Sequence, residues 1–119
     1  MTDFDKNELQ KRLLHFAVKL ILLIRKLPKG KEYEVISYQL IKSSSSSGAN
    51  YEEAQGAVSR ADFSNKIGIS LKEMRESNYW IQIIIAITES NTEWLEMKQE
   101  SSELMKILGS IFSKTSSKR

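Results

Sequence analysis

The sequence predicts an all-α protein: an up-down-up-down antiparallel four-helix bundle that associates with copies of itself. Three observations support this fold class. Apolar residues recur at alternating steps of three and four along four segments, which is the spacing of one buried helix face. A single proline and five glycines interrupt a chain of 119 residues, and few stretches alternate apolar with polar residues as strands do. A chain of this length forms one domain, so we expect a bundle over residues 1–112 and a basic C-terminal tail over residues 113–119.

The first helix is expected from about Asp5 to Lys26. Its main apolar stripe contains Leu9, Leu13, Phe16, Leu20, Leu23 and Leu27. A second apolar edge lies beside this stripe and contains Leu14, Ala17, Val18, Ile21, Leu22 and Ile24. A helix that is apolar around so much of its circumference needs cover on more than one side. In a protein this small, we expect part of that cover to come from another subunit.

A short turn at Leu27-Pro28-Lys29-Gly30 should end the first helix. Proline disfavours helical geometry in the residue before it, and glycine tolerates a chain reversal. Short connections place consecutive helices antiparallel, so the second helix should return alongside the first from about Glu32.

The second helix runs into a tract of five serines, Ser43 to Ser47, followed by Gly48. One interpretation is a flexible linker, because serine-rich and glycine-rich tracts are commonly solvated. The other is a continuous helix whose small side chains let a neighbouring helix approach closely. The helical spacing of Tyr33, Ile36 and Leu40 returns at Ala54 and Val58, which favours the continuous helix, with Gly48 as its weak or bent point.

Two capping signals predict where the remaining helices begin. Ser59 with Asp62 should open the third helix, which runs to about Thr88, and the segment from Ser90 to Glu93 should open the fourth. The buried stripe of the third helix contains Ile67, Leu71, Met74, Asn78, Ile81, Ile85 and Thr88. That of the fourth contains Trp94, Met97, Ser101, Leu104, Leu108 and Ile111.

A polar cluster is expected between the second and third helices, formed by Asn50, Glu53, Lys72, Arg75 and Asn78. Buried amide and carboxylate groups need hydrogen-bonding partners, which the residues of the third helix can supply. Such a cluster would fix the register of the packed helices. A ligand-binding or catalytic role is the alternative.

Several classes of site are missing from the sequence. The absence of cysteine excludes disulfides and thiolate ligands. The single histidine, His15, is expected at an interface, and Glu53, Glu73 and Glu76 lack the Glu-x-x-His pattern of di-iron bundles. There is no Gly-x-Ser-x-Gly elbow and no phosphate-binding loop. We therefore expect no enzymatic activity, no cofactor, no metal and no small-molecule substrate. An acidic N-terminus and the absence of an apolar run near 20 residues predict a cytoplasmic protein with no membrane partner.

The formal net charge is +3, from 18 basic and 15 acidic residues, which permits a nucleic-acid partner without requiring one. Two groups of cations are candidates for contacts with RNA or DNA phosphates. The turn after the first helix contains Arg25, Lys26, Lys29 and Lys31, and the C-terminal part of the chain contains Lys106, Lys114, Lys118 and Arg119. The first group shares its end of the bundle with carboxylates that should cancel much of its potential: Glu32, Glu34, Glu89 and Glu93. Solvated charge without a partner is the alternative for both groups.

Specific segments resemble a known family. They are Tyr38-Gln39-Leu40, the stretch Ser47-Gly48-Ala49-Asn50-Tyr51-Glu52-Glu53-Ala54-Gln55, Ala61-Asp62-Phe63, and Leu71-Lys72-Glu73 followed by Glu76 and Tyr79-Trp80. From about Leu13 to Ile111, the chain resembles the bacterial four helix bundle protein family. This family includes proteins encoded within intervening sequences of ribosomal RNA genes and is similar to the accessory protein of diversity-generating retroelements.

The resemblance implies a protomer that assembles into a homopentameric ring around a central channel, with no known enzymatic activity. The retroelement relative binds nucleic acid and a reverse transcriptase through a basic surface. Such relatives are strongly basic, whereas this chain carries only +3.

Three hypotheses for the function follow. The first is a non-enzymatic, ring-forming accessory or adaptor factor for nucleic acid or a ribonucleoprotein. The second is a structural or protein-binding oligomer with no nucleic-acid role, and the third is a metal-dependent enzyme. The sequence favours them in that order.

Overall fold

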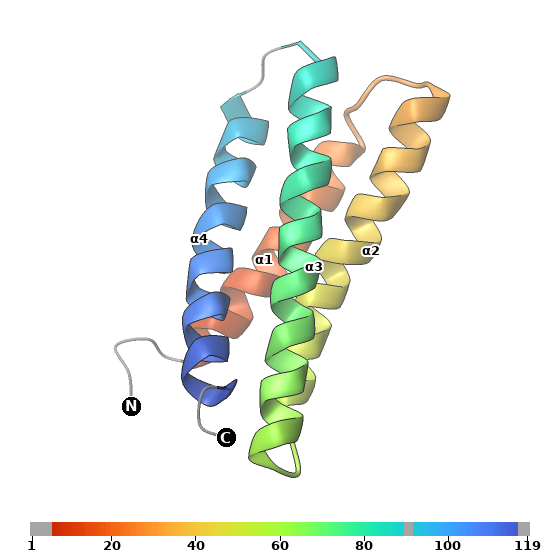
Figure 1. Ribbon diagram of the computed structural model, residues 1–119. Helices are drawn as coiled ribbons and strands as arrows, with labels where there is room; N and C mark the ends of the chain where they lie inside the picture. Colours follow the sequence, from red (N-terminus) through yellow and green to blue (C-terminus); the bar gives the residue numbers. More distant parts are fainter. Residues whose placement is uncertain (1–5, 90–91, 117–119) are drawn as a thin grey trace.

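The structure is a computed structural model that describes residues 6–89 and 92–116. Its four helices are α1 (Lys6–Ile24), α2 (Lys31–Ala54), α3 (Arg60–Ile87) and α4 (Thr92–Ser116). They run alternately up and down, with the α1–α2 and α3–α4 connections at one end and the α2–α3 connection at the other (Figure 1). Each helix packs against its two neighbours, and α4 closes back on α1. The predicted all-α bundle of four helices is confirmed.

The interior is built from the predicted stripes. Leu9, Leu13, Phe16, Leu20 and Leu23 of α1 are buried, as are Ile67, Leu71, Met74 and Ile81 of α3 and Trp94, Met97, Leu104 and Leu108 of α4. α3 makes more extensive contacts with α2 and α4 than α1 makes with its two neighbours. α1 is inclined behind the other helices (Figure 1). The order of the helices places the α1–α2 side of the bundle opposite the α3–α4 side.

The turn between α1 and α2 follows its sequence signals. The helix ends at Ile24, two residues before the predicted boundary, and Pro28 lies in the connection. Gly30 precedes α2 with φ = 156°, a backbone conformation that favours glycine because it has no Cβ. The predicted short antiparallel connection is confirmed.

The serine tract is helical, so the linker interpretation is wrong. Two buried pairs join it to α3. The hydroxyls of Ser43 and Ser77 lie 2.8 Å apart. Ser47 donates to the carbonyl of Ser70 (2.8 Å), and Ser70 donates to the carbonyl of Ser47 (2.7 Å). Small side chains whose polar groups are paired allow the two helices to pack closely without an unsatisfied buried group.

The end of α2 differs from the prediction. The helix stops at Ala54, and Val58, expected on the buried stripe, is 91% exposed in the α2–α3 turn. The reason is local: after Ala54 the backbone N–H groups of residues 55–57 bond to carbonyls three residues earlier, which ends the α-helical pattern. Ser59 then caps the next helix by accepting a hydrogen bond from the backbone N–H of Asp62 (3.0 Å). The predicted start of the third helix is therefore confirmed.

The last helix extends beyond the expected boundary at residue 112. Residues 113–116, predicted to be part of a frayed tail, are helical. Arg60 of α3 supplies the reason, since its guanidinium donates to the backbone carbonyls of Lys114 (2.9 Å) and Thr115 (3.2 Å). These carbonyls belong to the last helical turn, whose acceptors otherwise lack partners. The predicted capping residues Ser90 and Asn91 lie outside the described residues.

Candidate nucleic-acid interface

The expected polar cluster between α2 and α3 is not formed. The side-chain amide of Asn50 donates within its own helix, to the carbonyl (2.9 Å) and hydroxyl (3.1 Å) of Ser46. Glu53 instead accepts from Lys66 of α3 (3.0 Å), and this contact raises the pKa of the Lys66 ammonium. The physical reason is that the serines of α2 occupy the positions facing α3, which leaves Asn50 and Glu53 at the edge of the contact.

The three members of the expected cluster on α3 have separate environments. Lys72 and Arg75 are exposed. Asn78 is buried and faces α4 rather than α2: its amide donates to Ser101 (2.7 Å) and approaches Ser102 (3.4 Å). A buried polar residue therefore does lie in the interior, but it joins the other pair of helices.

The predicted cations of the α1–α2 turn are all exposed: Arg25, Lys26, Lys29 and Lys31. As the topology predicts, they share their end of the bundle with the connection that carries Glu89 (Figure 1). The carboxylates expected nearby on α2, Glu32 and Glu34, are exposed as well. This end of the bundle therefore contains charges of both signs.

The second predicted group is only partly described. Lys106 and Lys114 are exposed on α4, and Lys118 and Arg119 lie outside the described residues. Lys106 lies close enough to Glu103 to contribute to the lowered pKa of that carboxyl. Lys106 also belongs to a group of cations that the sequence had not brought together.

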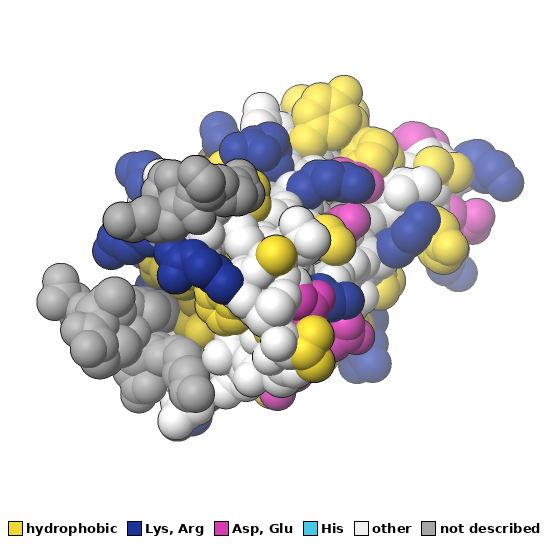
Figure 2. Space-filling view, turned by 60° about the horizontal axis from the view of Figure 1, so that its bottom comes forward, with side chains coloured by type: hydrophobic (Ala, Val, Ile, Leu, Met, Phe, Trp, Pro, Cys, Tyr) yellow, Lys and Arg dark blue, Asp and Glu magenta, His cyan; other side chains and the backbone are white. Residues whose placement is uncertain are grey.

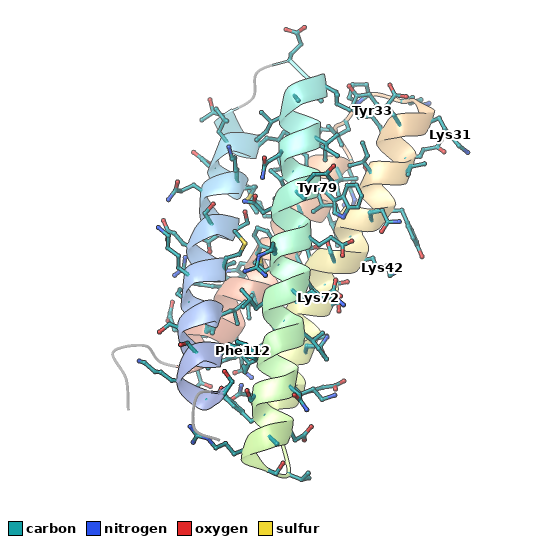
Figure 3. All side chains as sticks on the ribbon, in the orientation of Figure 1. Lys31, Tyr33, Lys42, Lys72, Tyr79 and Phe112 are labelled. Atoms are coloured by element: carbon teal, nitrogen blue, oxygen red, sulfur yellow. The ribbon has the colours of Figure 1, made fainter. Side chains whose placement is uncertain are left out.

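We call this group the α3–α4 cationic strip: Lys72 and Arg75 on α3, with Lys98 and Lys106 on α4. All four side chains are exposed. Among the residues that the structure describes, Lys72, Arg75 and Lys98 have no carboxylate within salt-bridge distance. Figure 3 labels Lys72 and Tyr79 on α3, two helical turns apart, with Tyr79 57% exposed.

The register of α3 and α4 brings Arg75 toward the cations of α4. Asn78 contacts Ser102, and Arg75 precedes Asn78 by three residues, which puts Arg75 on the α4 side of its helix. Lys98 and Lys106 lie four residues before and after Ser102, so they occupy the same face of α4. The strip is thus a consequence of helix geometry and of one hydrogen-bonded contact.

The helices also approach closely beside the strip. A Cβ atom placed on Gly68 of α3 would lie 2.9 Å from Cε1 of Phe112 on α4. Only glycine fits this contact without displacing the ring, and it lies one helical turn from Lys72. The contact keeps the two cationic helices close.

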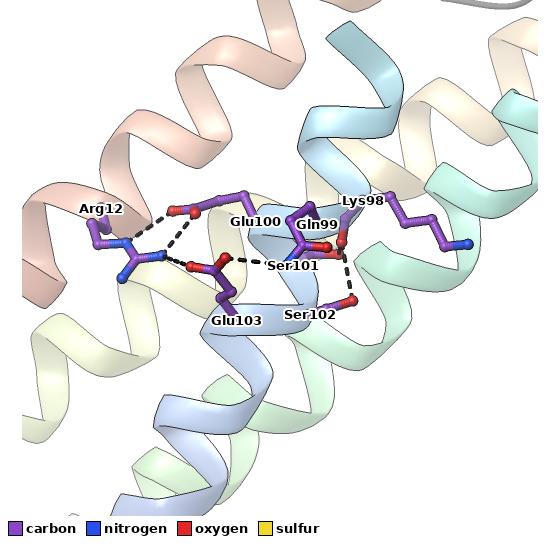
Figure 4. A network of polar contacts seen from close by, with 7 residues as sticks. All are labelled: Arg12, Lys98, Gln99, Glu100, Ser101, Ser102 and Glu103. Carbon is purple, nitrogen blue, oxygen red and sulfur yellow. Dashed lines mark hydrogen bonds and ion pairs between the residues drawn. The ribbon is translucent and has the colours of Figure 1, made fainter. Parts of the chain in front are cut away.

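Two carboxylates of α4, Glu100 and Glu103, contact α1. Arg12 of α1 makes a bidentate contact with Glu100 (3.0 and 2.7 Å) and a third contact with Glu103 (3.1 Å) (Figure 4). In the same view, Lys98 points away from Arg12. The contact with Glu100 raises the pKa of the Arg12 guanidinium, and hydrogen bonds from Gln99 and then Arg12 lower the pKa of Glu103.

Of the acidic residues of α3, Glu76 borders the strip, because it follows Lys72 by four residues, and its carboxylate is engaged by Trp80. Glu76 accepts from the indole N–H of Trp80 (3.0 Å). Glu73 precedes Ser77 by four residues, and Ser77 contacts α2, which places Glu73 on the α2 side. The space-filling view shows one region where Lys and Arg side chains gather with few Asp or Glu among them, toward the left, where α4 lies in Figure 1 (Figure 2).

Part of this arrangement has a sequence signal. Residues 72, 75 and 79 recur at steps of three and four, as do residues 98, 102 and 106 at steps of four. That spacing predicts two polar helix faces. It does not predict that these two faces lie next to each other.

A second surface is apolar and lies on the α1–α2 side. Leu14, Val18 and Leu22 of α1 are 63%, 45% and 47% exposed. Beside them, a groove of about 370 Å³ runs between α1 and α2 and includes Gly48 and Ala49 in its lining. We call Leu14, Val18, Leu22 and this groove the α1–α2 apolar surface. Within the described residues, the protomer leaves it uncovered, as expected from the width of the apolar region of the first helix.

The side chains considered as metal ligands, and the helices considered as membrane spans, were compared with the structure. Across residues 6–89 and 92–116, no group of three or more His, Cys, Asp or Glu side chains could hold a metal ion. His15 is exposed on α1, and Glu53 and Glu76 are engaged by Lys66 and Trp80. None of the four helices, as far as they are described, is long and apolar enough to cross a bilayer.

Comparison with known proteins adds two findings. The model of the 23S rRNA-intervening sequence protein family matches residues 5–110. A crystal structure of a protein of unknown function from the S23 ribosomal protein family of Bacteroides thetaiotaomicron VPI-5482 is similar, with 36% identity and a TM-score of 0.81. The similarity covers 91% of this chain and 97% of that one. Among curated proteins, no match was found.

Proposed function

This chain belongs to the 23S rRNA-intervening sequence protein family, and from that premise we propose that it is a non-enzymatic, homo-oligomeric accessory or adaptor factor for nucleic acid or a ribonucleoprotein. The observation that carries the proposal is the separation of two surfaces on one protomer. The α1–α2 apolar surface lies on one side of the bundle, and the α3–α4 cationic strip lies on the other. Copies can therefore associate through the first surface while the second remains accessible to a polyanion.

The apolar surface supports self-association. Leucine and valine side chains exposed in a continuous row on one helix are costly in water. About half of each is exposed, so burying the remainder contributes about 0.7–1.5 kcal/mol per side chain. A closed ring of identical subunits would bury this row in every copy. The resemblance to the bacterial four helix bundle family makes five the expected number of subunits.

Light scattering coupled to size-exclusion chromatography tests this part. We expect a single species whose mass is a multiple of the 13.7 kDa protomer. Leu14→Glu and Val18→Glu should shift it toward the monomer. Tyr38→Glu is the matched control, since Tyr38 is an apolar side chain that is 64% exposed on α2, outside the apolar surface. A monomeric wild-type protein at micromolar concentration would contradict the self-association.

Repetition of the cationic strip supports nucleic-acid binding. Four cations per protomer give a modest affinity alone, but linked copies engage a polyanion with increased avidity. We expect RNA or DNA to bind with an affinity that falls steeply as salt is raised from about 50 to 200 mM. An absence of binding at the lower salt concentration would remove the nucleic-acid role.

A second candidate function, a structural or protein-binding oligomer, has its own supporting observation. The α1–α2 groove has the size and apolar lining to accept side chains of a partner polypeptide. Co-purification of one specific protein, with an absorbance ratio that excludes nucleic acid, would favour this function. Substitution of Ala49, an exposed residue of the groove lining, by glutamate should then abolish co-purification.

A further inference from the structure

One aromatic side chain of the bundle is exposed next to the α3–α4 cationic strip. Tyr79 follows Arg75 by four residues and Lys72 by seven on α3, so it lies on the same part of the helix surface. Its side chain is 57% exposed, although burying an aromatic ring of this size would stabilise the fold. The combination of an exposed ring and neighbouring cations calls for a ligand that has both a flat face and negative charge.

We infer that the α3–α4 cationic strip binds single-stranded nucleic acid, with Tyr79 stacking on an unpaired base and the cations contacting the adjoining phosphates. This inference rests on the proposed function and specifies the form of nucleic acid and the surface. Aromatic platforms beside basic side chains are the shared chemistry of proteins that bind single strands without strong sequence preference.

The ring of Tyr79 is held in place before any ligand arrives. Tyr79 and Trp80 meet edge to face, with centroids 5.3 Å apart and planes at 67°. Trp80 is itself fixed, because its indole N–H donates to Glu76 (3.0 Å). A side chain with few rotatable bonds and a fixed neighbour loses little conformational entropy on binding. The ring is therefore suited to act as a stacking platform.

The geometry of the strip favours a single strand over a duplex. In a duplex the faces of the bases are covered by their neighbours, so an exposed ring on a helix surface meets only the backbone. Lys98 and Lys106 are separated by about 12 Å along the helix axis, a length suited to a short segment of unpaired chain. The four cations of the strip lie within α3 and α4 and not at a helix end. Tyr79 therefore contributes to affinity only when bases are unpaired.

The strip offers no feature that selects ribose over deoxyribose, so both kinds of single strand are suitable probes. We would measure fluorescence anisotropy with labelled oligouridylate and oligothymidylate of about 12 nucleotides. A labelled RNA hairpin of matched total charge, with its loop replaced by a non-nucleotide linker so that no base is unpaired, supplies the duplex comparison. Each titration is run with the full chain at about 50 mM and about 200 mM salt.

Tyr79→Ala is the decisive substitution. It should weaken binding of the single strands by about 5- to 150-fold, which is the loss in affinity that corresponds to removing one contact between a base and an aromatic ring. Binding of the hairpin should change by less than about twofold, since phosphate contacts remain. Tyr79→Phe keeps the stacking face and should retain the affinity for both single strands. Unchanged circular dichroism and oligomer mass establish that Tyr79→Ala still folds and assembles.

Two matched controls come from α2, which is not part of the strip. Tyr38→Ala removes another exposed tyrosine, and Lys42→Ala removes another exposed lysine (Figure 3). Neither should alter binding of the single strands. Lys72→Ala combined with Arg75→Ala should weaken both probes and lower the salt dependence, because two phosphate contacts are lost.

The outcomes separate this inference from the proposed function. If the hairpin binds as tightly as the single strands and Tyr79→Ala has no effect, the inference is overturned while a nucleic-acid role stands. If Tyr38→Ala or Lys42→Ala weakens binding as much as the substitutions in the strip, the surface has been assigned wrongly. If neither probe binds at the lower salt concentration, the proposed nucleic-acid function fails and the inference fails with it.

Discussion

Gly68→Ala tests whether the close contact between α3 and α4 constrains the bundle. The added methyl carbon would lie 2.9 Å from Cε1 and 3.4 Å from Cδ1 of Phe112, whereas carbon atoms pack at about 3.5–4.0 Å. The ring must therefore move by roughly 0.6 Å or more. Overpacking of this kind costs about 1–3 kcal/mol, and replacing glycine by alanine inside a helix returns about 1 kcal/mol. We expect Gly68→Ala to lie between neutral and about 2 kcal/mol less stable than the wild type.

Gly109→Ala is the matched control for this prediction. It makes the same exchange within α4, but nothing lies within 4 Å of the added Cβ. It should therefore stabilise the protein by about 0.5–1 kcal/mol. Urea denaturation followed by circular dichroism, at one protomer concentration for all variants, should separate the two substitutions by about 1–3 kcal/mol. The reasoning is refuted if both substitutions stabilise the protein equally. In a Phe112→Leu background the separation should shrink, since the clashing ring is gone.

Two further predictions concern polar contacts between the helices. Ser47→Ala should destabilise the protein by about 1 kcal/mol in thermal or urea denaturation, because it removes a buried hydrogen bond to Ser70. Ser45→Ala, at an exposed position of the same tract, should be neutral or slightly stabilising. Equal effects of the two substitutions would contradict the role of the buried pair. The pKa of Glu103 is lower in the folded than in the unfolded state. The ionised carboxylate of Glu103 therefore stabilises the fold fully at a pH above its pKa in the unfolded chain, and this stabilisation is lost as the pH falls toward its pKa in the folded protein. Arg12→Ala should therefore move the acid unfolding transition to higher pH, and an unchanged transition would show that the contact does not stabilise the fold.

Much of the fold was predictable because helix periodicity is a local property. The alternating steps of three and four identified the buried residues of α1, α3 and α4, and Pro28 with Gly30 identified the first turn. The serine tract was predicted to be helical on the same basis, despite its composition. What periodicity missed was the end of α2, where the spacing continues to Val58 although the helix has already ended at Ala54. A stripe shows which face is buried but not where the helix stops.

The polar sites were harder to predict, because they depend on how each helix is rotated against two neighbours. Spacing alone places Asn78 on a buried face, but it cannot decide between a partner on α2 and one on α4. The expected cluster assumed α2, whereas Asn78 contacts Ser101. Lys72 and Arg75 were expected as partners of Asn50 and Glu53 for the same reason, whereas both are exposed. Their neighbourhood with Lys98 requires the register between α3 and α4, which no single helix encodes.

The two-sided arrangement of charge on α4 changes how the small formal charge of the chain is to be understood. On one side of α4, Glu100 and Glu103 contact Arg12 of α1, whereas Lys98 points away from Arg12 on another side of the same helix. A molecule with few net charges can therefore present a one-sided electrostatic potential. Such a potential orients a diffusing polyanion before contact and raises the rate of encounter more than the final affinity. Measurements of the association rate constant at low ionic strength would detect this asymmetry even where equilibrium titrations show only modest binding.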